Sequence, residues 1–222
     1  MTVRSRVMDV LVVCAHPDAD SFNHAITDAV ERGLTKGGHH VTTLDLYALG
    51  FSAAMSADEH RAYKSWTPGN GTAPLLDPMA AEHAALVGQA GLLVFVYPTW
   101  WSQPPAILKG WLERVLVPGV AFTFDDRGKV RPGMEHVRRI VGISTYGSPW
   151  TYIKLTNDGG RPMITRALRM SCGMRTPTTW LGFYAVDTAG DEERKAFLDR
   201  VEHRMAHLAR PAWAGNAVKG SS

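Results

Sequence analysis

Cysteine is scarce in this chain of 222 residues, which contains only Cys14 and Cys172. The two residues are far apart in the sequence, and each lies among apolar neighbours. No CxxC pair and no Cys/His spacing typical of a metal site is present. These absences argue against a disulfide framework. We therefore expect both cysteines to be reduced thiols in the core, as is common in cytosolic proteins.

The sequence also lacks a long apolar run and an excess of one charge. The start, MTVRSRVMDVLVV, has too short an apolar stretch for a signal peptide or a membrane span, so we expect a cytoplasmic protein without membrane insertion. Lys and Arg number 24 against 21 Asp and Glu, and they are spread along the chain. A nucleic-acid-binding surface needs clustered basic residues with interleaved aromatic residues, so the sequence predicts no nucleic-acid partner.

Three common motifs of nucleotide-binding and hydrolytic proteins are missing. No GxGxxG follows the first apolar run, and neither GxxxxGK[ST] nor G-x-S-x-G is present. Gly69-Asn70-Gly71 lies in a loop and follows no strand pattern, so it is a weak signal. His203 and His207 have the i, i+4 spacing of metal ligands, but no third ligand is evident and no metal site is expected.

What the chain does contain is an alternation of strand and helix patterns. Its length and its 45% hydrophobic residues predict one domain over residues 1–210, followed by a flexible tail, 211–222, that is small and polar. Apolar runs predict strands at Met8–Cys14, His40–Leu46, Gly91–Tyr97, Val137–Ser144 and Thr176–Phe183. Helical spacing predicts helices at 21–36, 56–65, from Asp77-Pro78 onward, and at 107–115, 162–172 and 190–209. The charged stretch around residues 125–128 predicts a loop.

Strands that alternate with helices of this length indicate an α/β fold with a doubly wound parallel sheet and helices on both faces. Five strands favour the flavodoxin-like strand order over the larger dinucleotide-binding fold. In such a sheet the loops at the carboxyl ends of the strands meet at one edge, where ligands bind.

The first of these loops predicts a site for a phosphate group. In VLVVCAHPDADSFNHAITDAVERGL (10–34), a buried strand leads through a His-Pro turn directly into a helix that begins near Ser21. A helix start offers free backbone N–H groups and the positive end of the helix dipole, and Ser21, Asn23 and His16 add side-chain groups. Taken singly, Ser21 is equally well explained as a helix N-cap and His16 as a turn residue.

Two further loops follow strands at the same predicted edge. YPTWWSQPPA (97–106) presents flat apolar surface and backbone N–H groups, the combination that a planar ring such as isoalloxazine requires. STYGSPWTY (144–152) contains glycine and offers the Tyr152 hydroxyl to a redox-active ring or a substrate carbonyl. Paired tryptophans more often fill a core or an interface, and Tyr152 alone reads as a surface tyrosine. The convergence of three such loops is the stronger signal.

Three strings of this sequence resemble one known family. AHPDADSFNHAI, PTWWSQPPAILKGWLERVLVPGVAFTF and ISTYGSPWTY are similar to successive signatures of the flavin-dependent NAD(P)H:quinone oxidoreductases with a flavodoxin-like fold. The resemblance covers roughly Met8 to Leu208. The chain lacks the long C-terminal extension of the animal members and is more similar to the compact bacterial ones.

The resemblance implies roles for particular residues. The segment that binds the flavin pyrophosphate is matched by His16, Asp20, Ser21, Phe22, Asn23 and Ala25. The loop that cradles the isoalloxazine is matched by Pro98, Thr99, Trp100, Trp101 and Ser102. The loop on its pyrimidine side is matched by Ser144, Thr145, Tyr146 and Gly147, and the catalytic tyrosine by Tyr152. Positions that contact the adenosine of FAD are matched by Arg194 and Leu198, with Val186 upstream, which favours FAD over FMN. Substrate-site tyrosines are replaced by Phe122 and Phe124.

One departure concerns the proton that accompanies reduction. Animal members carry a histidine soon after the catalytic tyrosine, whereas this chain reads KLTNDGGRP there, with Asp158 nearest the position. Protonation is then arranged by Tyr152 alone, by Asp158 or by water. The expected reaction is a two-step exchange in which NAD(P)H passes hydride to the flavin and a quinone then takes its place. Tyr146 and Gly147 are expected to stabilise charge on the reduced ring through backbone N–H groups.

The sequence leaves other functions open. Some relatives are ancillary flavoproteins that regulate potassium-efflux systems, and this binding function is the main alternative to an enzyme. A single-electron carrier of the flavodoxin type ranks last, because those carriers are acidic and have a Ser/Thr-rich phosphate loop. Family members are usually homodimers, for which Trp66, Trp111 and Trp150 are candidate interface residues. The preference between NADH and NADPH cannot be assigned, because no basic pocket stands out in the sequence.

Overall fold

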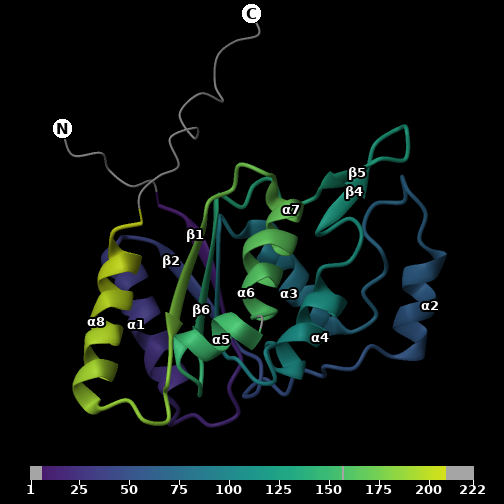
Figure 1. Cartoon of the computed structure of the whole chain (residues 1–222). Coiled ribbons are helices and arrows are strands. Elements are labelled where there is room, and N and C mark those ends of the chain that lie inside the picture. The colour runs from purple at the N-terminus through teal and green to yellow at the C-terminus, as the bar shows by residue number, and fades with distance from the viewer. Residues whose placement is uncertain (1–6, 157, 209–222) are drawn as a thin grey trace, which may run out of the picture.

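The computed structural model of this chain describes residues 7–156 and 158–208, and its centre is a five-stranded parallel sheet in the order β2-β1-β3-β6-β7. Figure 1 shows the sheet edge-on between two layers of helices. The strands are β1 (Asp9–Cys14), β2 (His40–Asp45), β3 (Leu92–Pro98), β6 (Arg139–Thr145) and β7 (Thr178–Phe183). All five strands predicted from the sequence are present, so the doubly wound α/β fold is confirmed.

The central strand explains why the apolar runs are continuous. Every residue of β3, LLVFVYP, is buried, because this strand has a neighbour on each side and helices on both faces. Its register aligns Val96 with Cys14 of β1 and Pro98 with Thr145 of β6. The carboxyl ends of these three strands therefore lie together at one edge of the sheet.

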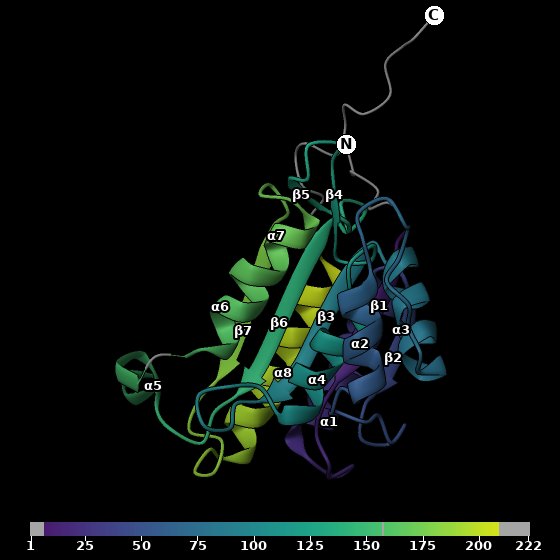
Figure 2. The ribbon, with the colours of Figure 1, turned by 90° about the vertical axis from the view of Figure 1, so that its right-hand side faces the viewer.

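Two helical layers cover the sheet. On one face lie α1 (Phe22–Lys36) and α8 (Asp191–Ala206), and on the other lie α3 (Pro78–Gln89), α4 (Ala106–Val115) and α7 (Leu168–Cys172). Figure 2 looks across the sheet with α8 behind it and α4 in front. No helix among residues 7–156 and 158–208 is both long enough and apolar enough to cross a bilayer.

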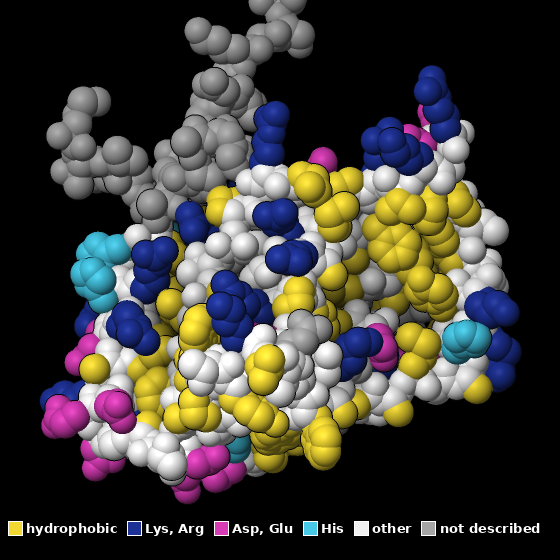
Figure 3. Space-filling model, viewed as in Figure 1, with side chains coloured by type: hydrophobic (Ala, Val, Ile, Leu, Met, Phe, Trp, Pro, Cys, Tyr) yellow, Lys and Arg dark blue, Asp and Glu magenta, His cyan; other side chains and the backbone are white. Residues whose placement is uncertain are grey.

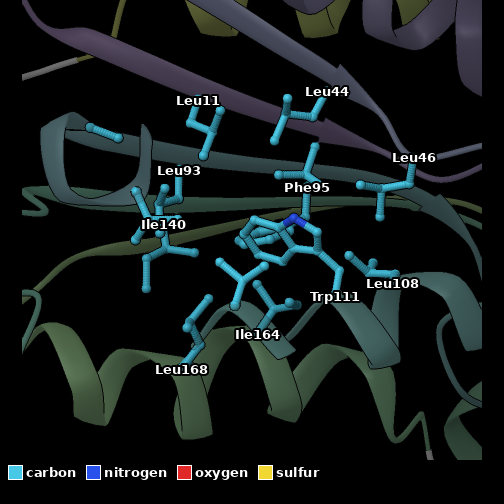
Figure 4. Close-up of a cluster of buried hydrophobic side chains, with 14 of the residues drawn as sticks. Leu11, Leu44, Leu46, Leu93, Phe95, Leu108, Trp111, Ile140, Ile164 and Leu168 are labelled. Carbon is cyan, nitrogen blue, oxygen red and sulfur yellow. The ribbon is translucent and has the colours of Figure 1, made fainter. Parts of the chain in front are cut away.

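Trp111 anchors the core beneath α4 and is fully buried (Figure 4). It packs with Phe95 of β3 and Ile164, and its Nε1 donates a hydrogen bond of 3.1 Å to Nδ1 of His83. Helical spacing places Trp111 on the same inward stripe as Ile107, Leu108 and Val115. The prediction that Trp111 serves a subunit interface is therefore wrong, because its side chain is used inside the chain.

Both cysteines lie in the interior. Cys14, at the end of β1, and Cys172, at the end of α7, are buried and free, as predicted. Burial raises the pKa of the Cys14 thiol to about 11 and that of Cys172 to about 12. Neither thiol forms a reactive thiolate near neutral pH.

Several short elements were not predicted. The charged loop is the turn of a hairpin formed by β4 (Phe122–Phe124) and β5 (Val130–Pro132), and α5 (Trp150–Thr156) follows β6. The helix predicted over 162–172 is divided into α6 (Gly160–Pro162), the π-helical turn η1 (Met163–Ala167) and α7.

Two other helices follow the predictions closely. The helix α2 (Ala57–Ser65) was predicted, and α8 ends at Ala206 rather than at 209. Residue 209 and the predicted tail, 211–222, lie outside the described residues.

One buried cation fastens α2 to the rest of the domain. The guanidinium of Arg114 in α4 donates to Glu59 of α2 at 2.6 and 2.8 Å and to Asp77, the N-cap of α3, at 2.6 Å. These interactions lower the pKa of both carboxyl groups against the opposing effect of their burial. The helix α2, which has no buried residue, is thus joined to α3 and α4 through one charged group.

Two helical glycines give a matched test of the packing between α1 and α8. A Cβ at Gly33 would lie 2.4 Å from the carbonyl oxygen of Glu202 in α8, whereas a Cβ at Gly88 in α3 would meet nothing within 4 Å. We expect Gly33→Ala to lower the free energy of unfolding by about 1–3 kcal/mol because the helices must separate. Gly88→Ala should raise it by about 0.5 kcal/mol through helix propensity. Urea unfolding of both variants checks this, and equal effects would contradict it.

Candidate functional site

A cavity of about 710 Å³ lies at the carboxyl edge of the sheet. Residues after β3, β6 and β7 and one side of α5 form its walls, and the lining consists of Pro98, Thr99, Trp100, Trp101, Ser102, Thr145, Gly147, Ser148, Tyr152, Ile153, Thr156, Val186 and Asp187. We call it the ring cavity. The second and third predicted loops therefore meet, as the parallel topology requires.

The first loop adjoins these walls without lining the cavity. The His16 ring lies 5.9 Å from the Trp100 ring, and Asn23 Nδ2 donates a hydrogen bond of 3.0 Å to Thr145 Oγ1. Asn23 is buried, and its Oδ1 has no hydrogen-bond partner among the described residues. Asn23 thus links the start of α1 to the end of β6 and retains an unsatisfied polar atom beside the site.

The start of α1 has the donors that an anion requires. Ser21 is its N-cap and accepts a hydrogen bond from the His24 backbone N–H. Within the described residues, the N–H groups of Phe22 and Asn23 have no backbone acceptor. Nδ1 of His16 lies 3.1 Å from the Asp18 backbone nitrogen and 3.2 Å from the Asp18 carbonyl oxygen, so it can accept from the first or donate to the second. The tautomer in which Nδ1 accepts carries its hydrogen on Nε2 and offers a further donor. Asp20 and Ala25 lie in the same turn, with Asp20 exposed.

His24 is a residue of this turn that the sequence analysis missed. Its Nδ1 lies 3.0 Å from Ser21 Oγ, and its Nε2 lies 2.9 Å from Oδ2 of Asp45, the last residue of β2. Oδ1 of Asp45 accepts the backbone N–H groups of Tyr47 and Ala48. The hydroxyl of Ser21 is thereby oriented through a chain of hydrogen bonds that is anchored on the neighbouring strand. The signal available in the sequence was Asp45 at the carboxyl end of the adjacent strand.

The second loop is held in a strained conformation. Trp101 and Ser102 have φ values of 50° and 60°, a region that side chains rarely adopt, and Trp100 pairs with Gln103 across the turn. This geometry leaves the Trp101 side chain 99% exposed at the rim. Thr99 Oγ1 lies 2.7 Å from Ser144 Oγ, which ties the base of the loop to β6.

The third loop divides its residues between the cavity and the interior. Gly147, Ser148 and Tyr152 face the cavity, and the Tyr152 side chain is 56% exposed. A Cβ at Gly147 would lie 2.8 Å from Oδ2 of Asp187, an exposed side chain of the loop after β7 that could move aside. In the described part of the chain, the Gly147 N–H has no backbone acceptor.

Tyr146 points away from the ring cavity. It is buried, it stacks on Tyr184 with ring centroids 4.6 Å apart, and its hydroxyl donates to Oδ2 of Asp158 at 2.5 Å. Burial, together with this hydrogen bond, raises the pKa of the phenol, so Tyr146 remains neutral. The Tyr146 side chain is an internal donor, and its backbone N–H already donates to the Phe183 carbonyl at 2.8 Å, so this structure leaves neither group free for the predicted stabilisation of a reduced ring.

Asp158 is also committed elsewhere. Its Oδ1 accepts the backbone N–H of Arg161 at 3.1 Å while its Oδ2 accepts from Tyr146. The carboxylate does not line the ring cavity and instead lines a neighbouring one. The structure therefore does not place Asp158 in the cavity where the reacting ring is expected.

The remaining predicted residues fall into two groups. Arg194 donates to the carbonyls of Val186 at 2.6 Å and Ala189 at 3.3 Å and lies over the Phe22 ring, whereas Leu198 packs in the core between α1 and α8. The other group is Phe122 and Phe124 of β4, which lie outside the ring cavity. The sequence analysis missed Ser148, Ile153, Thr156 and Asp187 as lining residues. Asp187 follows β7 at the same edge, and that position was its only signal.

No group of three or more His, Cys, Asp or Glu residues able to hold a metal ion occurs among residues 7–156 and 158–208. The donors at the site are hydroxyl, amide, imidazole and backbone groups. Such a set suits hydrogen bonds to an organic ligand and its phosphates.

Comparison with known proteins identifies the family. A family model described as "Flavodoxin-like fold" matches residues 8–208. The chain belongs to this flavodoxin-like family. Among curated proteins, the ribosyldihydronicotinamide dehydrogenase [quinone] of Pongo abelii is 29% identical over 220 residues, covering 88% of this chain and 90% of the relative. NAD(P)H dehydrogenase [quinone] 1 of Rattus norvegicus is 32% identical over 156 residues, covering 66% of this chain and 56% of that protein.

Solved structures of the same flavodoxin-like architecture include close matches in shape. The NAD(P)H:quinone oxidoreductase from Methanothermobacter marburgensis superposes with a TM-score of 0.76 at 26% identity, covering 90% of this chain and 96% of that one. Smu.1420 from Streptococcus mutans UA159 has the same TM-score at 27% identity, covering 90% and 99%. The resemblance to NAD(P)H:quinone oxidoreductases that the sequence indicated is confirmed.

Two buried tyrosines of this flavodoxin-like protein give opposite predictions. The Tyr97 hydroxyl, at the end of β3, has no partner among the described residues, whereas the Tyr146 hydroxyl is bonded to Asp158. Tyr97→Phe should raise the free energy of unfolding by about 1 kcal/mol by removing an unsatisfied group. Tyr146→Phe should lower it by about 1–2 kcal/mol. Urea unfolding at neutral pH measures both, and two changes of the same sign would contradict the assignment.

Proposed function

We propose that this chain is a flavin-dependent NAD(P)H:quinone oxidoreductase that transfers two electrons from NAD(P)H to a quinone or a similar acceptor. The observation that carries the proposal is the ring cavity, which adjoins a helix start equipped to bind phosphate at the carboxyl edge of the sheet. The quinone reductases among its relatives support the same assignment.

The residues present fit a flavin. The cavity volume of about 710 Å³ lies within the usual range for ligand sites, and Trp100 and Trp101 border it with flat apolar surface. Donors are available at both ends: the start of α1 with His16 would hold the phosphates, and the Gly147 N–H would face the ring. A bound flavin supplies the acceptance and donation of hydride.

The chain itself would orient the partners and stabilise charge. The strained loop around Trp101 would hold one face of the ring, and the Gly147 N–H would donate to oxygen atoms that gain negative charge on reduction. A cavity of this size would accommodate one further planar molecule at a time. We therefore propose that nucleotide and acceptor occupy it in turn.

The proton donor would be Tyr152 or water. Tyr152 is the phenol that lines the ring cavity, while Tyr146 and Asp158 bond to each other and do not line it. The exposure of the Tyr152 side chain keeps it in contact with solvent, so a donated proton would be replaced directly. Asp158 would then act only by fixing the position of Tyr146.

Two finer points belong to the same proposal. We propose FAD as the flavin, with Arg194 supporting its adenosine side through the Val186 carbonyl and the Phe22 ring.

We also propose a homodimer, because Phe122 and Phe124 lie outside the cavity of their own chain and would reach a substrate only in a second copy. Trp66, whose ring lies 5.6 Å from that of Phe124, and the exposed Trp150 remain candidate interface residues.

Two helix N-caps provide a matched test of flavin binding. Ser21 caps α1 inside the site, and Ser56 caps α2 outside it. Glycine preserves most of a cap's stability, so Ser21→Gly should mainly remove a hydroxyl donor and weaken flavin affinity about tenfold, while Ser56→Gly should not. The flavin is added as FAD or FMN to the purified chain and followed by its absorbance near roughly 450 nm. A wild-type chain that binds neither flavin would refute the proposed function.

Exchange of substrates at one cavity has a kinetic signature. With menadione and NAD(P)H varied together, we expect parallel double-reciprocal lines, because each substrate must leave before the other binds. Intersecting lines would contradict alternate occupancy while leaving the reductase activity itself in place.

A further inference from the structure

A second cavity of about 510 Å³ lies beyond α5 from the ring cavity. Its lining consists of Trp150, Ile153, Lys154, Asp158, Arg161, Pro162, Thr165, Arg166 and Tyr184. We call it the basic cavity. Ile153 lines both cavities, so one turn of α5 separates them. Figure 2 shows α5 standing out from the body of the sheet, and none of its residues is buried.

The basic cavity has a strong excess of positive charge. Lys154, Arg161 and Arg166 face a single carboxylate, Asp158, whose two oxygens already accept from Tyr146 and from the Arg161 backbone N–H. None of the three cations forms an ion pair within the described residues, whereas Arg32 and Arg131 elsewhere on the surface do. Figure 3 shows Lys and Arg side chains gathered over α6 and α7. Cations left unpaired in a hollow attract anions.

Local backbone geometry creates this arrangement. The π-helical turn η1, closed by a hydrogen bond from the Leu168 N–H to the Met163 carbonyl, lies between α6 and α7. It winds more loosely than an α-helix, and Arg161 and Arg166, five positions apart, both reach the same cavity. Gly160 allows α6 to approach the Tyr97 hydroxyl, because a Cβ there would lie 3.0 Å from it. Turns of this kind are often found at functional sites.

We infer that the basic cavity binds the 2′-phosphate of NADPH while the nicotinamide occupies the neighbouring ring cavity. This inference rests on the proposed function and adds a preference for NADPH over NADH. The planar guanidinium groups of Arg161 and Arg166 suit a phosphate group, and Lys154 adds a third cation at the boundary with the ring cavity. The ring cavity has only Asp187 as a charged lining residue and offers a phosphate no such attraction.

Binding of a nucleotide fragment tests the inference without turnover. Isothermal titration of the flavin-loaded protein with 2′,5′-ADP and with 5′-AMP should give clearly tighter binding of 2′,5′-ADP. In the double variant R161Q/R166Q, affinity for 2′,5′-ADP should fall about tenfold or more, as expected for loss of charge-assisted hydrogen bonds. The matched control is K195Q/R200Q on α8, which removes two exposed cations outside both cavities and should leave the affinity unchanged.

Steady-state kinetics shows whether the basic cavity binds the 2′-phosphate of NADPH or an anionic electron acceptor. R161Q/R166Q should raise KM for NADPH about tenfold, with little change in kcat or in KM for NADH. Unchanged KM for NADPH, or equal binding of 2′,5′-ADP and 5′-AMP by the wild-type protein, would overturn the inference while quinone reduction with NADH persists. If R161Q/R166Q lost affinity for a sulfonated naphthoquinone but not for NADPH, the inference would also be overturned, because the basic cavity would then bind the acceptor. Failure of the proposed function would instead appear as absence of flavin binding.

Discussion

Parallel pairing of β3 with both β1 and β6 is the constraint on which the rest of the site depends. It brings the ends of three strands, separated by long stretches of chain, to one edge of the sheet. The hydrogen bond from Asn23 to Thr145 then fixes the start of α1 relative to the end of β6. Without this pairing, the turn before α1 and the walls of the ring cavity would be unrelated segments. Packing of the sheet therefore brings the loops together, and the geometry of each loop then places its side chains, as at Trp101.

A group of polar and aromatic side chains lies beside this edge. The buried Tyr146 stacks on Tyr184 and donates a short hydrogen bond to Asp158, and none of the three lines the ring cavity. Asp158 is also the one acidic group that the described lining of the basic cavity sets against Lys154, Arg161 and Arg166. The hydrogen bond to Asp158 thus turns the Tyr146 phenol away from the ring cavity, while the cations around Asp158 outnumber its single negative charge.

The sheet and its order were predictable because buried strands have continuous apolar runs such as LLVFVYP, and the parallel topology then placed the loops. The hairpin of β4 and β5 was missed, since strands of three residues are too short to show a period. Trp111 was misjudged because an aromatic residue at an inward helical position was taken for a surface one. The orientation of Tyr146 depends on the ring of Tyr184, which is distant in sequence. The basic cavity was invisible because Lys154, Arg161 and Arg166 meet only through a bend and a π-helical turn.

The depth of Cys14 has a consequence for chemical durability. Quinones are electrophiles to which thiolates add, and Cys14 ends the strand that leads into the turn before α1. Its raised pKa and its enclosure, matched at Cys172, leave the described part of the chain with no accessible thiolate for such a molecule to alkylate. A protein built this way would tolerate repeated encounters with a reactive acceptor without being consumed by it.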